Sequence, residues 1–270
     1  ITKKDEQTLT QLAESGTDLE SVGNTKLDNG GVIAPTQCLV SKRLTEKLMQ
    51  DNNFPFASYY NGHTNKHGNN WSGWNAETLR RGILMGTILG KKIAIRSEER
   101  ETINPRQKTG RIDKRLVAAL GYDYESVFTT KEIDKFKKVF LHISIDGSGS
   151  MSGKCWDDTL AVTIAICKAA SMVSNLLVQV SIRGTWGDKP YVCIAYDSRM
   201  DKFEKIKRLF PALHANGTTP EGLCYQAIMK HFVESNKDMD SYFINICDGE
   251  PTFSNSQCSY GGENAVLHTK

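Results

Sequence analysis

The segment VFLHISIDGSGS, residues 139–150, is the strongest structural signal in this chain. Its first seven residues are typical of a buried strand, and a Gly/Ser turn then leads into a nearly all-apolar helix predicted over 156–177. Further strands are predicted over 177–184, 191–196 and 242–247, and further helices over 201–210 and 220–234. Strands that alternate with helices of this length predict an α/β fold with a doubly wound, mostly parallel sheet flanked by helices.

The first part of the chain carries weaker patterns. Residues 1–35 are polar and rich in Gly, Asp and Asn, which predicts loop with at most one short helix. Residues 36–51 place Leu39, Leu44 and Leu48 near helical spacing. That spacing predicts a short amphipathic helix.

A long amphipathic helix is predicted over 75–96, where apolar residues recur at helical spacing. Asn75 is the expected N-cap. The glycines Gly82, Gly86 and Gly90 recur every four residues and so share one stripe of this helix. Glycine weakens a helix but lets a neighbour approach closely, so we expect this stripe to pack against another helix.

Pro105 ends this pattern and a basic, mixed segment follows. We therefore divide the chain into three regions. They are a mainly helical and loop-rich N-terminal region (1–105), a basic linker (106–136) and an α/β domain (137–270).

Composition excludes several protein classes. The chain has 270 residues, 39% of them hydrophobic and 24% charged, which is typical of a globular protein. No apolar run reaches the roughly 18 residues that a membrane-spanning helix needs. The first ten residues, ITKKDEQTLT, do not resemble a signal peptide, so we expect residue 1 to be internal to a longer polypeptide.

The seven cysteines are odd in number and form no C-x-x-C pair, which argues against a zinc knuckle or a redox dithiol. Cys167, Cys193 and Cys247 lie in apolar runs, where cysteine behaves as a small hydrophobe. A reducing compartment is the simplest interpretation. We expect a cytoplasmic protein, or a virion protein if a phage encodes it.

A possible metal site begins directly after the first predicted strand. Asp146, Ser148 and Ser150 alternate with glycine, so their oxygen-bearing side chains can point to one side of the turn. In an open α/β sheet, ligands bind beyond the carboxyl ends of the strands. Hard oxygen ligands suit Mg²⁺. A flexible polar turn is the alternative interpretation of this segment alone.

Two later loops add residues of the same chemistry. Thr219 precedes the predicted helix that starts near Pro220, and Asp248 follows the strand over 242–247. Each has an ordinary interpretation, Thr219 as a helix cap and Asp248 as a turn residue. All of these residues, however, occur at strand or helix entry points.

In these residues the sequence resembles the von Willebrand factor A (VWA) domain and its metal-ion-dependent adhesion site. The resemblance covers about 137–270. It implies that Ser148, Ser150 and Thr219 ligate Mg²⁺, or another divalent cation such as Mn²⁺, directly. It also implies that Asp146 and Asp248 act largely through water. The family's pattern is Gly-Gly-Thr-Pro, with the threonine directly before the proline, whereas this chain has Gly-Thr-Thr-Pro.

A second, weaker likeness lies upstream. The segment TGRID, residues 109–113, is similar to a Gly-Arg-Leu-Asp element in the VWA-bearing subunit of cobalt chelatase and its bacterial and phage relatives. That likeness implies a metal-dependent protein-interaction adaptor that works with a separate AAA+ ATPase ring in metal insertion or protein remodelling. A complete VWA sheet has further elements after Asp248, so we expect the C-terminal part of the domain to be incomplete here.

The expected partners are an AAA+ ATPase subunit or an acidic protein ligand that completes the metal site, and oligomerisation is compatible with both. We expect the chain to be non-catalytic alone, as one subunit of an ATP-dependent metal chelatase. An adhesion or structural component, such as a virion protein that retains the VWA fold, is the alternative. The chain contains no G-x-x-x-x-G-K-[ST], H-E-x-x-H or G-x-S-x-G motif.

Two further features leave alternatives open. His63 and His67 lie in an Asn/Gly loop flanked by aromatic residues, where solvent exposure is the ordinary interpretation and metal binding the other. The aromatic residues are Tyr59, Tyr60, Trp71 and Trp74. Residues 80–115 carry eleven Lys/Arg against four Asp/Glu. The ordinary interpretation is a solvated helix face, and the second is a surface that docks on an acidic partner. A nucleic-acid groove comes third, because no base-reading module accompanies the charge.

Overall fold

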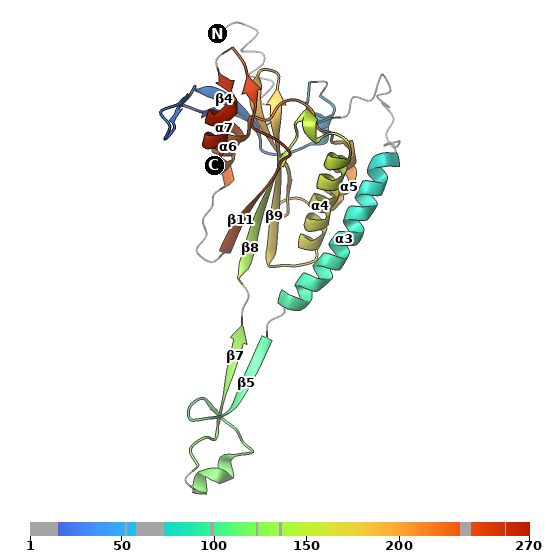
Figure 1. Ribbon diagram of the computed structural model, residues 1–270. Helices are drawn as coiled ribbons and strands as arrows, with labels where there is room; N and C mark the ends of the chain where they lie inside the picture. Colours follow the sequence, from blue (N-terminus) through green and yellow to red (C-terminus); the bar gives the residue numbers. More distant parts are fainter. Residues whose placement is uncertain are drawn as a thin grey trace.

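The description of the fold covers most of the chain. A computed structural model describes residues 16–51, 53–57, 73–97, 100–122, 124–134, 137–232, 239–256 and 258–270 (Figure 1). The histidine and aromatic loop predicted around His63 lies outside the described residues, apart from the backbone of Trp74.

A six-stranded sheet forms the centre of the molecule. In spatial order its strands are β1 (Thr17–Val22), β4 (Thr36–Ser41), β10 (Lys189–Asp197), β9 (Leu176–Trp186), β8 (Lys138–Asp146) and β11 (Met239–Ile246). Neighbours pair in parallel at β4–β10, β9–β8 and β8–β11, and antiparallel at β1–β4 and β10–β9. The prediction of a mixed α/β fold with a mostly parallel sheet is confirmed.

Helices cover both faces of this sheet (Figure 1). One face carries α3 (Gly73–Ser97), α4 (Lys154–Ala170) and α5 (Glu204–Leu209), and the other carries α6 (Glu221–Phe232) and α7 (Gly262–Thr269). Successive residues of a strand point to opposite faces, so β10 sends Tyr191 into the α4-side core and Val192 into the α6-side core. The central strands β8, β9 and β10 are therefore buried on both faces, which explains their largely apolar sequences, whereas the edge strand β11 is mostly exposed.

Smaller elements complete the chain. The short strands are β2 (Thr25–Lys26), β3 (Val32–Ile33), β12 (Phe253–Ser254) and β13 (Ser259–Tyr260). The short helices are α2 (Glu46–Met49), η1 (Val117–Tyr122), η2 (Gly149–Met151) and η3 (Phe210–Ala212). A separate ribbon projects from the body and consists of β5 (Arg100–Gln107), β7 (Phe128–Asp134) and β6 (Arg111–Ile112) (Figure 1).

The predicted helix over 36–51 is wrong for most of its length. The first part is strand β4, and only Glu46–Met49 is helical. Leu39, Leu44 and Leu48 nevertheless all lie in the same core. Their spacing imitates a helix because a strand, a loop and a helical turn each contribute one buried leucine.

Other boundaries also shift. The helix predicted over 156–177 ends at Ala170, and a turn leads into β9, which begins at Leu176. Asn75 lies inside α3, which begins at Gly73, so Asn75 is not its N-cap. The segment predicted as a basic linker forms most of the β5–β7–β6 ribbon, in which Pro105 sits at an irregularity of β5.

The cysteines follow the burial of their strands. All seven are free thiols. Cys167 and Cys193 are buried, as predicted, and burial raises their pKa values. Cys247 is exposed, contrary to prediction, because it follows the edge strand β11.

The glycine stripe packs α3 closely against α4, as predicted. A β-carbon at Gly86 would lie 2.5 Å from the carbonyl oxygen of Ala165, and one at Gly82 would lie 2.8 Å from Ile164. Real β-carbons do not approach other atoms this closely. The small residue is therefore what lets the two helices touch through their backbones.

We expect Gly86→Ala to destabilise the protein by about 1–3 kcal/mol, because overpacking outweighs the better helix propensity of alanine. The measurement is the urea midpoint followed by circular dichroism. Gly121→Ala is the matched control, since a β-carbon at Gly121 meets nothing within 4 Å. An unchanged midpoint for Gly86→Ala would show that α3 moves away from α4 at little cost.

Candidate functional site: a hydroxyl and carboxylate cluster at the sheet edge

The candidate site lies where β8 and β11 end. These strands are parallel and in register, with Ile246 opposite Ile145, so Asp146 and Asp248 emerge at the same edge of the sheet. The helix α6 also begins at this edge. Its first residue, Glu221, accepts a hydrogen bond from Arg183, which lies near the end of β9. The topology alone therefore brings three loops together.

Four of the five predicted residues form one hydrogen-bonded chain. The Ser148 backbone N–H donates to Asp146 Oδ1 at 2.9 Å, and the Ser148 and Ser150 hydroxyl oxygens are 3.0 Å apart. Ser150 Oγ then donates to Asp248 Oδ1 at 2.9 Å. Asp146 and Ser148 are buried, whereas Ser150 and Asp248 are exposed. The cluster thus runs from the protein interior to solvent.

The fifth residue, Thr219, reaches the same edge through its backbone. Gly149 N–H donates to the Gly217 carbonyl at 3.0 Å, which joins the loop of Thr219 to the serine loop. Thr219 itself exchanges two backbone hydrogen bonds with Thr252, 3.0 and 2.9 Å long. Thr219 is buried and Thr218 is exposed, so the two threonines occupy different environments.

Gly147 is what allows the serine loop to sit so close to the sheet. Its N–H donates to the Arg183 carbonyl at 2.8 Å, and its own carbonyl accepts from Asn216 at 2.6 Å. A β-carbon at this position would lie 2.5 Å from the Phe56 ring. Any larger residue would push the loop, and with it Ser148, away from the strand ends.

The buried carboxylate is only half satisfied. Asp146 Oδ2 is one of three buried side-chain polar atoms that have no hydrogen-bond partner within the described part of the chain. Burial raises the pKa of Asp146, while the positive charge of Arg183 and the Ser148 N–H oppose that rise. An unsatisfied buried oxygen of this kind is unusual in a native structure and is consistent with a site for a cation.

Sequence reasoning missed the ion pair behind the cluster. Arg183 stands opposite Asp146 in the β8–β9 register and is fully buried. Its Nη2 donates to Glu221 Oε1 at 2.7 Å, and its Nη1 donates to Ser144 Oγ at 3.0 Å. The only signal in the sequence is that Arg183 is the one charged residue of strand β9.

Two neutral donors also hold Glu221. The Tyr225 hydroxyl and the Asn245 side-chain amide each donate to Glu221 Oε1 at 2.7 Å. The buried pair is therefore embedded in a polar network that links β9, β11 and α6. This network holds in place the guanidinium of Arg183 and the carboxylate of Glu221, the two charged groups that act on the pKa of Asp146.

His142 belongs to the same polar face of the sheet but not to the cluster. Its ring nitrogens lie 3.0 Å from Gln179 Oε1 and 2.9 Å from Ser181 Oγ. Burial lowers its pKa to about 4. His142 is therefore a neutral, hydrogen-bonded sheet residue at neutral pH.

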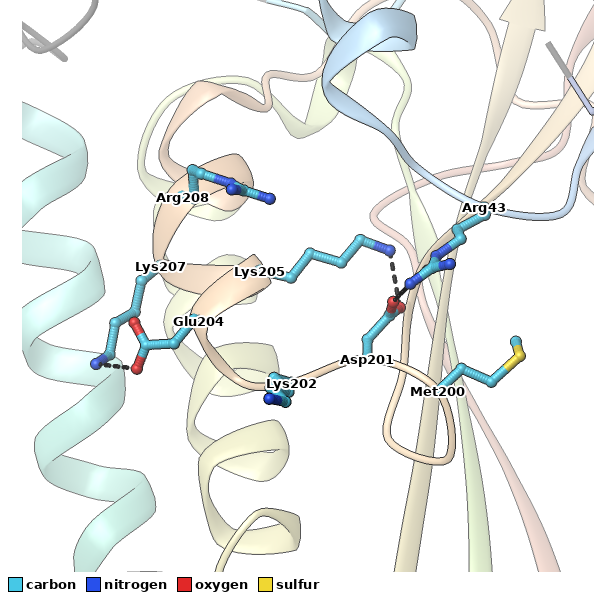
Figure 2. Close-up of a pocket in the computed structure, with 8 residues that line it drawn as sticks. All are labelled: Arg43, Met200, Asp201, Lys202, Glu204, Lys205, Lys207 and Arg208. Atoms are coloured by element: carbon cyan, nitrogen blue, oxygen red, sulfur yellow. Dashed lines mark hydrogen bonds and ion pairs between the residues drawn. The ribbon is translucent and has the colours of Figure 1, made fainter.

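A pocket of about 760 Å³ lies beside α5 and shares no residue with the cluster (Figure 2). The buried carboxylate of Asp201 accepts from Arg43 at 2.6 Å and from Lys205 at 2.7 Å. On the rim, Lys207 pairs with Glu204 at 2.8 Å. The lining carries five Lys/Arg side chains against two carboxylates, so the pocket is basic and offers a cation none of the free oxygen donors found at the sheet edge.

Comparison with known proteins adds no assignment. A search of protein families finds no match for this chain, and a search of curated proteins finds none either. Within the described residues, no three His, Cys, Asp or Glu side chains gather as a metal-binding group. A candidate metal centre here would have to use hydroxyl oxygens as well as carboxylates. The described helices include no candidate membrane span.

Proposed function

We propose that this chain is a metal-dependent protein-interaction adaptor with a VWA-type, doubly wound fold. In this proposal it works with a separate AAA+ ATPase ring of the cobalt-chelatase kind, in metal insertion or protein remodelling. The chain recognises its partner and the ring supplies the ATP-driven motion.

One observation carries the proposal, namely the half-satisfied carboxylate of Asp146 at the inner end of a chain of hydroxyl and carboxylate oxygens. Oxygen donors of this kind suit Mg²⁺, which keeps several water ligands and binds few protein groups. Ser148, Ser150 and Thr219 would hold the ion, with Asp146 and Asp248 beside them. The donor set therefore fits a hard divalent cation.

The position of the cluster also supports the proposal. Ligands of open α/β sheets bind beyond the carboxyl ends of the strands, and the cluster follows β8 and β11 at such an edge. When bound, the ion would offer an open coordination position to a carboxylate of the partner. The residues of this chain orient the hydroxyls, and Arg183 offsets the charge of Asp146.

The test is calorimetric titration of the purified chain with Mg²⁺ and Mn²⁺. Ser150→Ala and Thr219→Ala are each expected to weaken binding about 10–100-fold, because each removes one oxygen ligand or its support. Thr218→Ala is the matched control and is expected to bind like the wild type, since Thr218 is exposed and is not the threonine next to Pro220.

Two results would contradict the proposal. One is a wild-type chain that binds neither cation. The other is equal affinity in wild type, Ser150→Ala and Thr219→Ala. A loss of cation binding in Thr218→Ala alone would instead identify Thr218, rather than Thr219, as the ligand.

A further inference from the structure

The long helix α3 has two apolar sides, and only one of them is covered. The glycine side packs on α4, where a β-carbon at Gly90 would lie 2.9 Å from the Met172 sulfur. Leu79 and Ile83 also pack against the core. Successive residues of a helix are rotated by about 100°, which places Leu84, Ile88 and Ile95 on the side opposite the glycines.

These three side chains, which we call the α3 ridge, face solvent. Leu84 is 58% exposed, Ile88 50% and Ile95 66%. Met85 and Leu89 are exposed beside them. A helix that is apolar on opposite sides is normally enclosed between two neighbours, whereas α3 has a neighbour on one side only among the described elements.

The ridge is bordered by positive charge. Arg80 and Lys91 follow one side of it and Arg81 and Lys92 the other, as the same helical rotation places them. No acidic residue occurs between Thr78 and Ser97. Lys91 and Lys92 are exposed and have no ion pair with the described residues. An apolar seam with charged borders is the pattern by which paired helices select their partners.

We propose that the α3 ridge is the docking surface for an amphipathic helix of a partner protein whose apolar seam is flanked by Glu and Asp. Leu84, Ile88 and Ile95 bury their side chains in that seam. The bordering Lys91 and Lys92 pair with the acidic flanks, whereas Arg80 and Arg81 already pair with Glu77 and Asp158. This surface is separate from the metal-site edge and goes beyond the proposed function, on which it does not depend.

Charge argues against a second copy of this chain as the occupant. Two α3 helices packed along their ridges would bring Lys91 and Lys92 of both copies together, and the two nearest arginines already use their carboxylate partners, Arg80 with Glu77 and Arg81 with Asp158. Like charges that face each other across paired helices are destabilising. An acidic partner removes that repulsion and adds attraction.

The shape of the ridge argues against a lipid surface. Helices that lie in a membrane interface present a broad apolar face, usually with Trp or Phe. The exposed apolar side chains of α3 are Leu84, Ile88 and Ile95 with Met85 and Leu89 beside them, and none of them is aromatic. Helical rotation places Arg81 and Lys92 between the ridge and Met85, so cations interrupt the apolar side, as in the seam of a helix pair.

The experiment uses the full 270-residue chain and two synthetic helical peptides with the same Leu/Ile seam. One peptide has Glu at the flanking positions and the other has Lys. Binding is measured by fluorescence anisotropy in EDTA, so that the metal site plays no part. We expect the Glu-flanked peptide to bind at least about tenfold more tightly than the Lys-flanked one, and its affinity to fall with added salt.

Three variants locate the surface. Ile88→Glu is expected to weaken binding of the Glu-flanked peptide by about tenfold or more. Lys91→Glu combined with Lys92→Glu is expected to reverse the preference between the peptides. Val32→Glu is the control, because Val32 is 62% exposed but lies on β3. It should bind like the wild type.

Several outcomes would overturn the proposal. They are failure of the Glu-flanked peptide to bind, equal binding of both peptides, and binding unaffected by Ile88→Glu. Binding to phosphatidylserine vesicles without binding to the peptide would assign the ridge to membranes. Self-association that Ile88→Glu abolishes would assign it to a second copy. The Asp146→Ala variant is expected to bind the Glu-flanked peptide like the wild type. Loss of peptide binding in this variant would contradict the separation of the α3 ridge from the metal site.

Discussion

Under the proposed function, the Asp146→Ala variant is expected to lose Mg²⁺-dependent capture of an AAA+ partner while its fold stays nearly intact. Asp146 begins the oxygen chain of the cluster, so its removal takes away the inner carboxylate and the support of the Ser148 N–H. The variant loses little apolar burial, because the lost group is a single polar side chain at the sheet edge. The effect on binding should therefore be near complete.

In EDTA the same variant is expected to melt at or above the wild-type temperature. Burial raises the pKa of Asp146, so keeping its carboxylate ionised costs folding free energy at pH values above the ordinary carboxyl range. Alanine removes that cost at neutral pH. As the pH falls into the carboxyl range the group is protonated in both states, and the advantage of alanine should shrink.

The measurements are affinity purification with Mg²⁺ or EDTA and thermal melting across pH. Asp188→Ala is the matched control, because Asp188 is an exposed carboxylate in the β9–β10 turn at the same sheet edge. It should retain partner capture. Undiminished capture by Asp146→Ala would leave the cluster as a structural turn and remove the basis of the proposed function.

Four of the six strands of the sheet, β8, β9, β10 and β11, were predictable because their sequences are largely apolar. The predicted segments 139–145, 177–184, 191–196 and 242–247 all lie within or overlap observed strands. Local sequence sufficed for β8, β9 and β10, since a strand buried on both faces needs apolar residues at nearly every position. The edge strand β11 is also apolar, although most of its residues are exposed. The direction of β10 was not predictable, because it depends on the hairpin that joins it to β9.

The helix α3 shows a different limit of sequence reasoning. Its apolar spacing predicts an amphipathic helix and its glycines predict a close contact with another helix, and the glycine stripe does pack on α4, but Leu84 and Ile88 of the same apolar pattern are exposed. Glycine counts as neutral in a hydrophobic pattern although it permits the closest packing. Periodicity therefore predicts the helix, but it does not tell which of its apolar residues are buried.

The residues of the candidate cluster could be predicted from the sequence because they follow the ends of predicted strands. Asp146 and Asp248 directly follow apolar runs, and parallel strands end at a common edge. The Arg183–Glu221 ion pair could not be predicted from the sequence. Its two residues are 38 positions apart, and their contact depends on where α6 lies on the sheet. A single sequence contains no signal for that placement.

The largest stability loss is expected from Arg183→Met. The substitution leaves the Glu221 carboxylate buried with only neutral donors, and breaking a buried ion pair from one side costs about 3–5 kcal/mol. Arg80→Met is the matched control, since Arg80 and Glu77 form an exposed pair. The control should change stability by less than about 0.5 kcal/mol.

The double variant Arg183→Met with Glu221→Gln distinguishes lost charge pairing from lost volume. Glutamine keeps an oxygen that can accept from Tyr225 and Asn245 but carries no charge that needs compensation. We therefore expect the double variant to be more stable than Arg183→Met alone, with a coupling energy of about 1–3 kcal/mol in urea unfolding. Strict additivity of the two single changes would contradict this. It would mean that Arg183 stabilises the sheet by packing rather than by its charge, and that the field offsetting the buried charge of Asp146 comes from elsewhere.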